Sequence, residues 1–461
     1  MRRSPWSSTV PALLLALGAS AQVPVPPEQA APLPRLTSGP GLELGAAAVA
    51  VDGGVDGTTP VTESVSFQEA VDRAMVRNPS VLTALQEVNR VNGLMEEVRA
   101  ASIPTLAANL NYVRLNAAKQ YGSLVISPLN QWTGNITLAI PLLAPAAWAN
   151  AIRANDQVGV SRLNAADVRR VIATNAAKAY ISLFAQKRQV EVNSIARDTA
   201  RVQFDYAKKR LDGGIGNKVD AARAAQTLES AEVLLQASYL NLYKAQEALG
   251  VLLGAKGPVD AAEPPTFPQL PGLDDALADA PKLRTDIRLS DEEVRTADKS
   301  LNMSWMEYLP TINLIGQPFW QDPSADPNSP WGWQVQAQLS WTIFDGGARY
   351  GRTHQREATL EENKLTLEGT SRQVLSDVRQ SFDTYKRSSR ALEAARRAAA
   401  YGVDTYRLAD ISYRAGASTN LDLIDAFRVA RDTATLAIIA EDSLRQSALD
   451  LLVAAGKFPS R

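Results

Sequence analysis

Hydrophobic and polar residues alternate along the stretch WGWQVQAQLSWTIF, which covers residues 331–344. Trp333, Val335 and Leu339 share one parity, whereas Gln334 and Gln336 share the other. This two-residue period predicts a β-strand with one apolar and one polar face. The same alternation occurs over residues 106–112, 135–140 and 312–314. We therefore expect two β-hairpins, at about 105–142 and about 311–344, with strands of about ten residues, the length of a tilted transmembrane strand.

Long helices are predicted by the spacing of prolines and of apolar residues. No proline lies between Pro145 and Pro258 or between Pro330 and Pro459, and interior proline breaks a helix. Helices over about 146–211 and 348–413 would each be about 100 Å long. In the second helix, apolar residues step by three and four as in a coiled-coil seam. The remaining helix faces are polar, so no apolar stripe is wide enough to cover the sheet.

The two halves of the chain are copies of one another. A shift of 202 residues places Gly214 on Gly416 and Asp220 on Asp422 without a gap. Each half is predicted to run helix, strand, loop, strand, very long helix, tight turn, helix. The predicted organisation is a signal peptide at 1–21, a flexible Pro/Gly/Ala-rich leader at 22–64, a first repeat at 65–256 with its tip near 212–217, a Pro-rich linker at 257–281, a second repeat at 282–456 with its tip near 414–419, and a tail at 457–461.

Composition removes several functional classes. The 461 residues contain 48 Lys and Arg against 49 Asp and Glu, so no basic surplus indicates a nucleic-acid partner. Cysteine is absent and His354 is the single histidine, which argues against a metal site or a cysteine nucleophile. No cofactor or enzymatic activity is expected, because convergent catalytic motifs are missing. Beyond the signal peptide no apolar run reaches 18 residues, so any membrane span is expected to consist of strands.

The predicted strands need partners from other chains. Four strands leave open edges, which are costly in lipid, so several chains must complete a closed sheet. Two chains would supply eight strands and a filled interior, whereas three would supply twelve and an open lumen. The polar residues on the inward face favour the wider arrangement. The alternative is an ordinary sheet packed against soluble helices, in which the tryptophans would be core residues.

Three segments resemble the TolC family of outer membrane efflux and secretion channels: VSFQEAVDRAMVRNPSV at 65–81, LSWTIFDGGARYGR at 339–352, and YRAGASTNLDLIDAFRVA at 413–430. The resemblance covers about residues 65–456. It implies a mainly α-helical fold, in which a homotrimer combines a twelve-strand β-barrel in the outer membrane of a Gram-negative bacterium with a periplasmic α-barrel. It also implies outer membrane lipid, an adaptor protein and an inner membrane pump of RND or ABC type as partners, in tripartite efflux or type I secretion.

The resemblance assigns an aperture at the turns that end the long helices. In this family a tyrosine and an arginine form a latch that ties the tunnel shut, and aspartates ring its aperture. The latch tyrosine falls on Tyr413, and the aperture aspartates fall on Asp422 and Asp425, with Asp220 in the first repeat. The latch arginine falls on Ser418, and Arg414 is a candidate substitute. Three chains would place six carboxylates of the second repeat around one opening, favouring cations and raising some of their pKa values. The alternative for Asp220 and Asp422 is helix capping.

Two further groups of residues are candidates. The resemblance implies that the adaptor docks on the tips at Gly214, Ile215, Gly416 and Ala417, whereas loop glycines without a partner are the rival interpretation. Gly213, Gly214 and Gly416 are expected to have positive φ. Five of the eight tryptophans lie in or beside the predicted hairpins and suggest an interfacial belt: Trp132, Trp320, Trp331, Trp333 and Trp341.

The leading hypothesis is a passive export channel. The alternative is a periplasmic coiled-coil adaptor of the same machines, which would be expected to have one helical hairpin flanked by compact β domains. The cargo, whether drug, metal ion, lipid or protein, is not indicated by the sequence.

Overall fold

The computed structural model describes residues 63–121, 124–324 and 329–459, which belong to a unit spanning Thr59–Arg461. The predicted signal peptide and all but the last two residues of the predicted leader lie outside the described residues. The described chain is mainly α-helical, which confirms the predicted fold class at that level.

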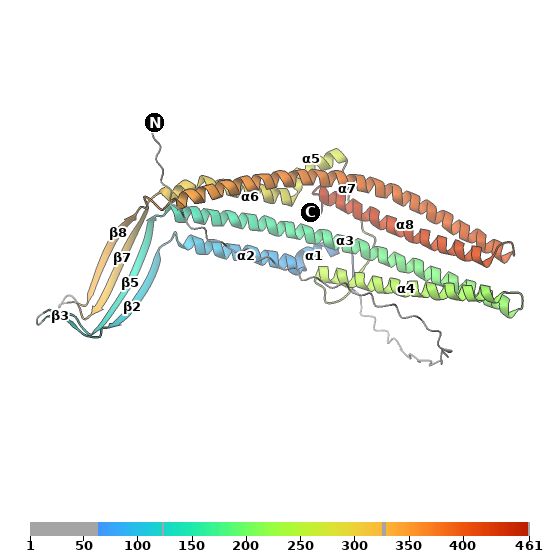
Figure 1. The fold of residues 1–461 in the computed structure, drawn as a ribbon, viewed down its shortest axis with the longest axis horizontal. Coiled ribbons are helices and arrows are strands. Elements are labelled where there is room, and N and C mark those ends of the chain that lie inside the picture. The colour runs from blue at the N-terminus through green and yellow to red at the C-terminus, as the bar shows by residue number, and fades with distance from the viewer. Residues whose placement is uncertain (1–62, 122–123, 325–328, 460–461) are drawn as a thin grey trace, which may run out of the picture. The chain divides into compact units, whose positions relative to one another are not determined.

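Both halves have the same order of major elements (Figure 1). The first half contains β1 (Glu63–Val65), α1 (Phe67–Arg77), α2 (Pro79–Ala100), β2 (Thr105–Arg114), β3 (Lys119–Tyr121), β4 (Leu124–Ser127), β5 (Asn130–Leu143), α3 (Pro145–Asp212) and α4 (Lys218–Leu253). The second half contains β6 (Val259–Ala261), α5 (Leu273–Leu283), α6 (Thr285–Asn302), the short 3₁₀ helix η1 (Ser304–Tyr308), β7 (Thr311–Asp322), β8 (Trp331–Ser340), α7 (Ala348–Arg414) and α8 (Asn420–Ala454).

The four long strands form one antiparallel sheet in the order β2-β5-β7-β8. Figure 1 shows this sheet at one end of the long helices and the helix turns at the opposite end. Within the described part of the chain, no helix packs on either face of the sheet. Its side chains are therefore presented to the surroundings on both sides.

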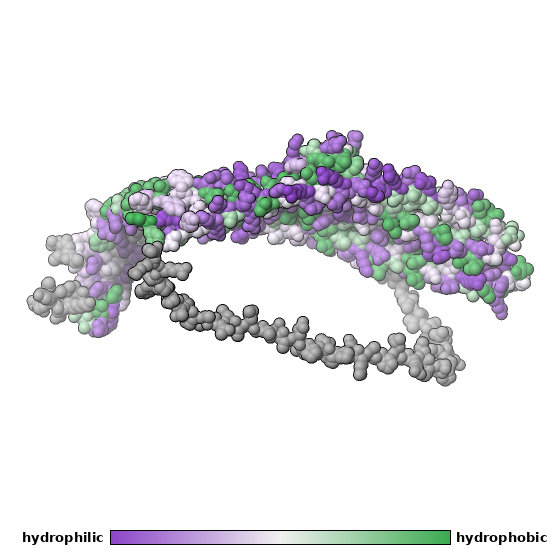
Figure 2. All heavy atoms as spheres, turned by 45° about the horizontal axis from the view of Figure 1, so that its top comes forward, coloured by the Kyte–Doolittle hydropathy of each residue, from purple (hydrophilic) through white to green (hydrophobic). Residues whose placement is uncertain are grey.

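The long helices form two antiparallel hairpins, α3 with α4 and α7 with α8. Half of the side chains that α3 buries are alanines, including Ala173, Ala177, Ala196 and Ala200. Small residues let helix axes approach closely, so the hairpins pack without a thick apolar core. Figure 2 shows hydrophilic and hydrophobic residues interspersed over the helices rather than gathered in a continuous apolar layer.

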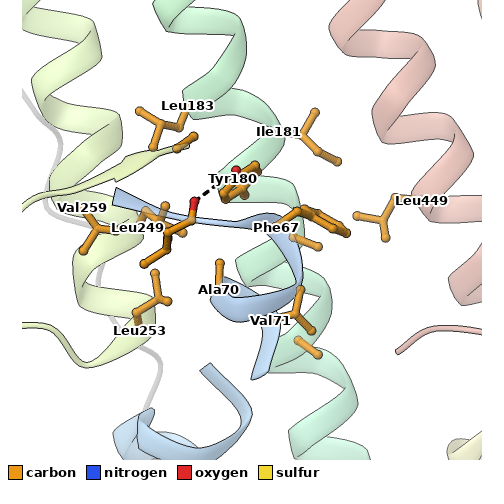
Figure 3. Packing of buried hydrophobic residues seen from close by; sticks show 14 of the residues in the cluster. Phe67, Ala70, Val71, Tyr180, Ile181, Leu183, Leu249, Leu253, Val259 and Leu449 are labelled. Carbon is orange, nitrogen blue, oxygen red and sulfur yellow. Dashed lines mark hydrogen bonds between the residues drawn. The ribbon is translucent and has the colours of Figure 1, made fainter. Parts of the chain in front are cut away.

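The largest core cluster lies midway along α3, where β1, α1, β6 and the ends of α4 and α8 meet (Figure 3). Phe67 packs edge-on against Tyr180, with ring centroids 5.5 Å apart. The Tyr180 hydroxyl lies 2.8 Å from the Glu263 carbonyl and 3.2 Å from the Val65 carbonyl. Leu449 of α8 joins the same cluster. This core holds the two halves of the chain together.

Some elements differ from the sequence-based expectations. Strand β8 ends at Ser340 rather than near residue 344, because Ser340 pairs with Thr311, the first residue of β7, and no partner remains beyond it. The first hairpin loop contains the short strands β3 and β4, which pair with each other.

The predicted linker at 257–281 is also ordered in part. It contains β6, which pairs in parallel with β1, and most of α5. This pairing draws Glu63 and Ser64, assigned to the leader, into the fold. In the predicted tail, Phe458 is buried in the core, and Lys457 forms an ion pair with Asp279. Elements of three residues are too short to show a period in sequence.

Candidate functional site

Strand register places the two parity classes on opposite faces of the sheet. Leu106 lies opposite Leu138, and Gly316 opposite Val335, so apolar positions of neighbouring strands share one face. The other parity contributes the polar residues of all four strands. Large side chains on the apolar face, among them Leu106, Leu110, Ile136, Val335 and Leu339, are exposed. The two faces of the sheet thus differ in chemistry as the alternation predicts.

The polar face carries a network of side-chain hydrogen bonds across the strands. Asn109 Nδ2 of β2 donates to Asn135 Oδ1 of β5 at 3.1 Å, and Gln317 Nε2 of β7 donates to Thr137 Oγ1 of β5 at 3.2 Å. Gln334 of β8 donates to Gln317. Amide and hydroxyl groups therefore line this face from one edge of the sheet to the other, a surface that suits water and not hydrocarbon.

The predicted tryptophans lie at two levels of the sheet. Trp132, Trp320, Trp331 and Trp333 gather at the loop end, where Trp320 pairs with Trp331 in register and the ring of Tyr112 lies 4.7 Å from that of Trp132. Trp333 is 77% exposed, which is unlike a core residue. Trp341 lies at the helix end, where its indole Nε1 donates to the carbonyl of Tyr308 at 3.1 Å.

The two aromatic levels are eight residues apart along the chain. Trp333 and Trp341 share one parity and are about 26 Å apart along an extended strand. At the tilt of about 35–45° that transmembrane strands have, this distance corresponds to about 20 Å along the membrane normal, compared with an apolar band of about 25 Å between the aromatic girdles of such sheets. Three exposed rings that the sequence analysis missed accompany Trp341: Trp305, Tyr308 and Tyr350. These residues flank the second hairpin in sequence, and this position could have indicated that they belong to the aromatic level at its helix end.

The helix tips have the same backbone structure in both halves. In each turn the amide of a glycine bonds to the carbonyl three residues earlier, and the next amide bonds five residues back, the pattern of a Schellman motif. Gly214 and Gly416 have φ of 74° and 76°, as the motif requires, whereas Gly213 has φ of −79°. Positive φ at Gly213 was therefore a wrong prediction, because Gly214 is the residue that reverses the chain. Ile215 and Ala417 follow the two glycines and are exposed.

Tyr413 lies in a cluster of aromatic rings and cations between α3 and α7. The Arg210 guanidinium lies 5.5 Å from the centre of the Tyr413 ring and 5.8 Å from that of Tyr206. Tyr413 is only 7% exposed, and burial, reinforced by nearby Asp220, raises the pKa of its hydroxyl. The Arg414 guanidinium also lies over the Tyr206 ring, 5.4 Å from its centre. These contacts fasten the two long helices together near their tips.

Arg414 and Ser418 differ in their surroundings. The Arg414 Nε lies 2.9 Å from Asp410 Oδ2 in the same helix, and this contact raises the pKa of Arg414. Ser418 Oγ is buried and has no hydrogen-bond partner among the described residues.

Arg210 and Tyr206, which the sequence analysis missed, contact Tyr413. No local pattern indicates them, because about 200 residues separate them from it.

The three candidate aspartates have different roles in the single chain. Asp422 completes a capping box with Thr419, whose hydroxyl and backbone amide both donate to the carboxylate and lower its pKa. This direction is opposite to the rise expected from mutual repulsion, because the cap stabilises the charged form. Asp425 pairs with Arg428 at 2.7 Å, and both side chains are exposed. The structure brings only Asp220 near Tyr413.

Asn420 joins the two helical hairpins at their tips. Its side-chain amide donates to the backbone carbonyl of Asp220 at 3.2 Å, and its side chain is buried. The first turns of α4 and α8 therefore lie together. Sequence alone gave no reason to single out this residue, because asparagine at the start of a helix is common for local reasons.

Two features are absent from the residues that the structure describes. No helix there is both long and apolar enough to cross a membrane. In the same residues, no group of three or more histidine, cysteine, aspartate or glutamate side chains is placed to hold a metal ion.

Comparison with known proteins identifies relatives. The family model described as "Outer membrane efflux protein" matches residues 70–255 and 274–457. Outer membrane protein OprJ of Pseudomonas aeruginosa is 24% identical over 484 aligned positions, covering 99% of this chain and 96% of OprJ. The probable efflux pump outer membrane protein TtgC of Pseudomonas putida is 22% identical over 268 positions, and this chain spans about half of its length, 54%.

Solved structures show the same fold. The Campylobacter jejuni CmeC outer membrane channel superposes with a TM-score of 0.73 at 16% identity, covering 85% of each chain. The open state of the Neisseria gonorrhoeae MtrE outer membrane channel superposes with a TM-score of 0.70 at 20% identity, covering 85% of this chain and 88% of MtrE.

These comparisons decide between the alternatives of the sequence analysis. The matched proteins are outer membrane efflux proteins and not enzymes, and the adaptor alternative is not supported. The predicted location, an outer membrane with a large periplasmic part, is confirmed. Because the family model matches most of the chain, the protein belongs to the outer membrane efflux protein family.

Proposed function

We propose that this protein is a trimeric channel that passively exports molecules through the outer membrane. In this account the apolar face of the β2-β5-β7-β8 sheet contacts lipid, and the polar face lines a water-filled lumen. An adaptor and an inner membrane pump supply the energy and the cargo, in tripartite efflux or type I secretion. The channel itself makes and breaks no covalent bond.

The observation that carries the proposal is the chemistry of the two uncovered sheet faces. One face is apolar and bordered by tryptophans at both ends, whereas the other carries the hydrogen-bonded amides of Asn109, Asn135, Gln317 and Gln334. A soluble protein would bury the first face, because exposed apolar area is unfavourable in water. Lipid on one side and water on the other satisfies both faces.

The open edges of the sheet support association of several chains. Within the described residues, β2 and β8 each pair on one side only, so each leaves a row of backbone groups free. In hydrocarbon each unpaired group costs several kcal/mol, which favours pairing of β2 with β8 of another chain. Three chains would close twelve strands around an open lumen.

The long helices also leave large apolar side chains for neighbouring chains. These side chains are exposed in the single chain and are separated by 7 and 11 residues on α4 and by 7 and 3 residues on α7, intervals that keep each set on one side of its helix: Val233, Leu240 and Val251 on α4, and Tyr401, Leu408 and Ile411 on α7. Side-by-side helices of adjacent chains would bury them as coiled-coil seams. The expected product is a helical tunnel continuous with the lumen.

At the tips, we propose that Asp425 contributes the charge of the aperture and that Asp422 mainly caps α8. The exposed Asp425–Arg428 pair is a weak surface interaction, so Asp425 remains available to passing ions. We propose that the Arg210–Tyr413 contact holds the tip closed. It would take the role of the family's latch arginine, whose position is occupied by Ser418 in this chain. The exposed tip residues Gly214, Ile215, Gly416 and Ala417 are the proposed adaptor-docking surface.

Reconstitution tests the proposed function. The purified full-length protein should behave as a trimer and produce discrete single-channel currents in planar lipid bilayers. A protein that stays monomeric in detergent and never conducts would refute the proposal. Three further relatives are named as an antibiotic efflux pump protein, a toluene efflux pump protein and a fusaric acid resistance protein, so we propose these compounds as cargo classes to test in transport assays.

A further inference from the structure

A cluster of arginines lies where the sheet meets the helices. Glu307, in η1, accepts hydrogen bonds from three guanidinium groups: Arg352 Nε at 2.9 Å, Arg153 Nη2 at 3.3 Å, and Arg356. Arg153 comes from α3, and the other two come from the first turns of α7. One carboxylate therefore serves three cations drawn from two helices.

The cluster carries an excess of positive charge. A second carboxylate, Asp345, lies 3.0 Å from Arg349 Nε and 3.9 Å from Arg352 Nη2. Four guanidinium groups thus face two carboxylates, which leaves two positive charges without a counterion in the cluster. Most of these side chains are largely buried, but that of Arg352 is 48% exposed. Arg352 is the point at which the excess charge reaches the surface.

The crowding of these arginines is unfavourable for folding alone. Arg349 lies in the first turn of α7, whose positive end repels cations. Asp345 offsets this effect by accepting the backbone amides of Gly347 and Arg349 and pairing with the Arg349 guanidinium. Burial, together with repulsion from Arg356, lowers the pKa of Arg153. A bound anion would relieve the remaining repulsion between the guanidinium groups.

Exposed aromatic rings lie beside the cluster. The Arg349 guanidinium lies 4.8 Å from the centre of the Tyr308 ring, and the backbone carbonyl of Tyr308 accepts from Trp341. Trp341 continues the apolar row of β8 beyond Leu339. The arginines therefore lie next to the point where the apolar face of the sheet ends. Tryptophan and tyrosine rings gather at this level of a bilayer, beside the lipid headgroups.

We infer that Arg352, backed by Arg349 and Arg356, binds the phosphate of an anionic phospholipid in the periplasmic leaflet of the outer membrane, an inference that rests on the proposed insertion of the sheet. The guanidinium group presents paired N–H donors that match phosphate oxygens. The neighbouring aromatic rings would contact the glycerol and upper acyl chain of the same lipid. A lipid is favoured over a second protein chain because the charge and the rings lie together at the end of the apolar face.

Lipid retention tests the inference. The full-length protein is reconstituted in nanodiscs of equal phosphatidylglycerol and phosphatidylcholine, released into mild detergent, and analysed by native mass spectrometry. The wild-type protein should retain phosphatidylglycerol in preference to phosphatidylcholine. Arg352→Gln should retain about fivefold less, because one interfacial arginine is removed. Arg352→Lys, which keeps the charge but lacks the paired donors, should restore the binding in part. Arg372→Gln, which removes an exposed arginine farther along α7, should behave as wild type.

Several results would overturn the inference. One is equal retention by the wild type and Arg352→Gln. Another is equal retention of the two lipids by the wild type, or displacement of phosphatidylglycerol by inorganic phosphate at comparable concentration. A third is absence of lipid together with a cross-link from Arg352→Cys to a neighbouring subunit, which would assign the charge to a protein contact. Currents recorded from the same preparation separate this failure from failure of the proposed channel, since a conducting channel without lipid preference refutes only the lipid site.

Discussion

Ala337, in the middle of β8, offers a sharp test of which sheet face meets lipid. It lies opposite Leu314 on the apolar face, four residues from Trp333 and four from Trp341. Those intervals place it about 13 Å from each aromatic level, at the expected midplane of the bilayer. We expect Ala337→Arg to destabilise the membrane-inserted protein by about 2–4 kcal/mol. That cost corresponds to a change of about 30- to 1,000-fold in the folding equilibrium.

Gln336→Arg is the matched control, because it introduces the same side chain one residue away on the polar face. It should cost less than about 1 kcal/mol, since the new charge remains in water, and should shift ion preference toward anions. Urea unfolding of the reconstituted protein, followed by tryptophan fluorescence, measures the change in the free energy of unfolding for each substitution. Equal destabilisation by the two substitutions, or a larger effect of Gln336→Arg, would refute the assignment of the faces.

Three further predictions concern the tips and the core. Asp425→Ala should reduce cation preference in bilayer recordings more than Asp422→Ala does, and the reverse order would remove Asp425 from the aperture. Arg210→Ala removes contacts with two rings worth about 1–2 kcal/mol, so it should raise open probability about five- to thirtyfold. Lys209→Ala, which removes the neighbouring charge, should not, and equal effects would count against the latch. Tyr180→Phe removes the hydroxyl that lies against the Glu263 and Val65 carbonyls and should destabilise the fold by about 1–3 kcal/mol. An unchanged thermal midpoint of unfolding would contradict a stabilising role for this hydroxyl.

The long patterns in the sequence predicted the long strands and helices correctly. Alternation over residues 331–340 specifies β8, and its parity correctly separates Val335 from Gln336 on the two faces. The absence of proline likewise indicates α3 and α7, which the structure shows as uninterrupted helices. Both signals extend over ten residues or more, so local chance patterns do not mimic them.

Contacts between distant segments were beyond prediction from the sequence. The β1–β6 pair joins two segments of three residues, and backbone hydrogen bonding gives it no side-chain signature. Arg210 and Tyr413 meet because the packing of the two helical hairpins brings the ends of α3 and α7 together near the tips. The arginines around Glu307 come together for the same reason. Such clusters depend on tertiary geometry, which no local pattern in the sequence indicates.

The central claim is that one face of the sheet contacts lipid while the other contacts water, and cysteine accessibility tests it most directly. The natural chain has no cysteine, so single substitutions at residues 334–339 each introduce one thiol. In the membrane-embedded trimer, a water-soluble maleimide should label the variants at Gln334, Gln336 and Gln338 and spare those at Val335, Ala337 and Leu339. All six should react after denaturation. Uniform labelling of the six variants in intact membranes, or preferential labelling of the apolar positions, would contradict the account.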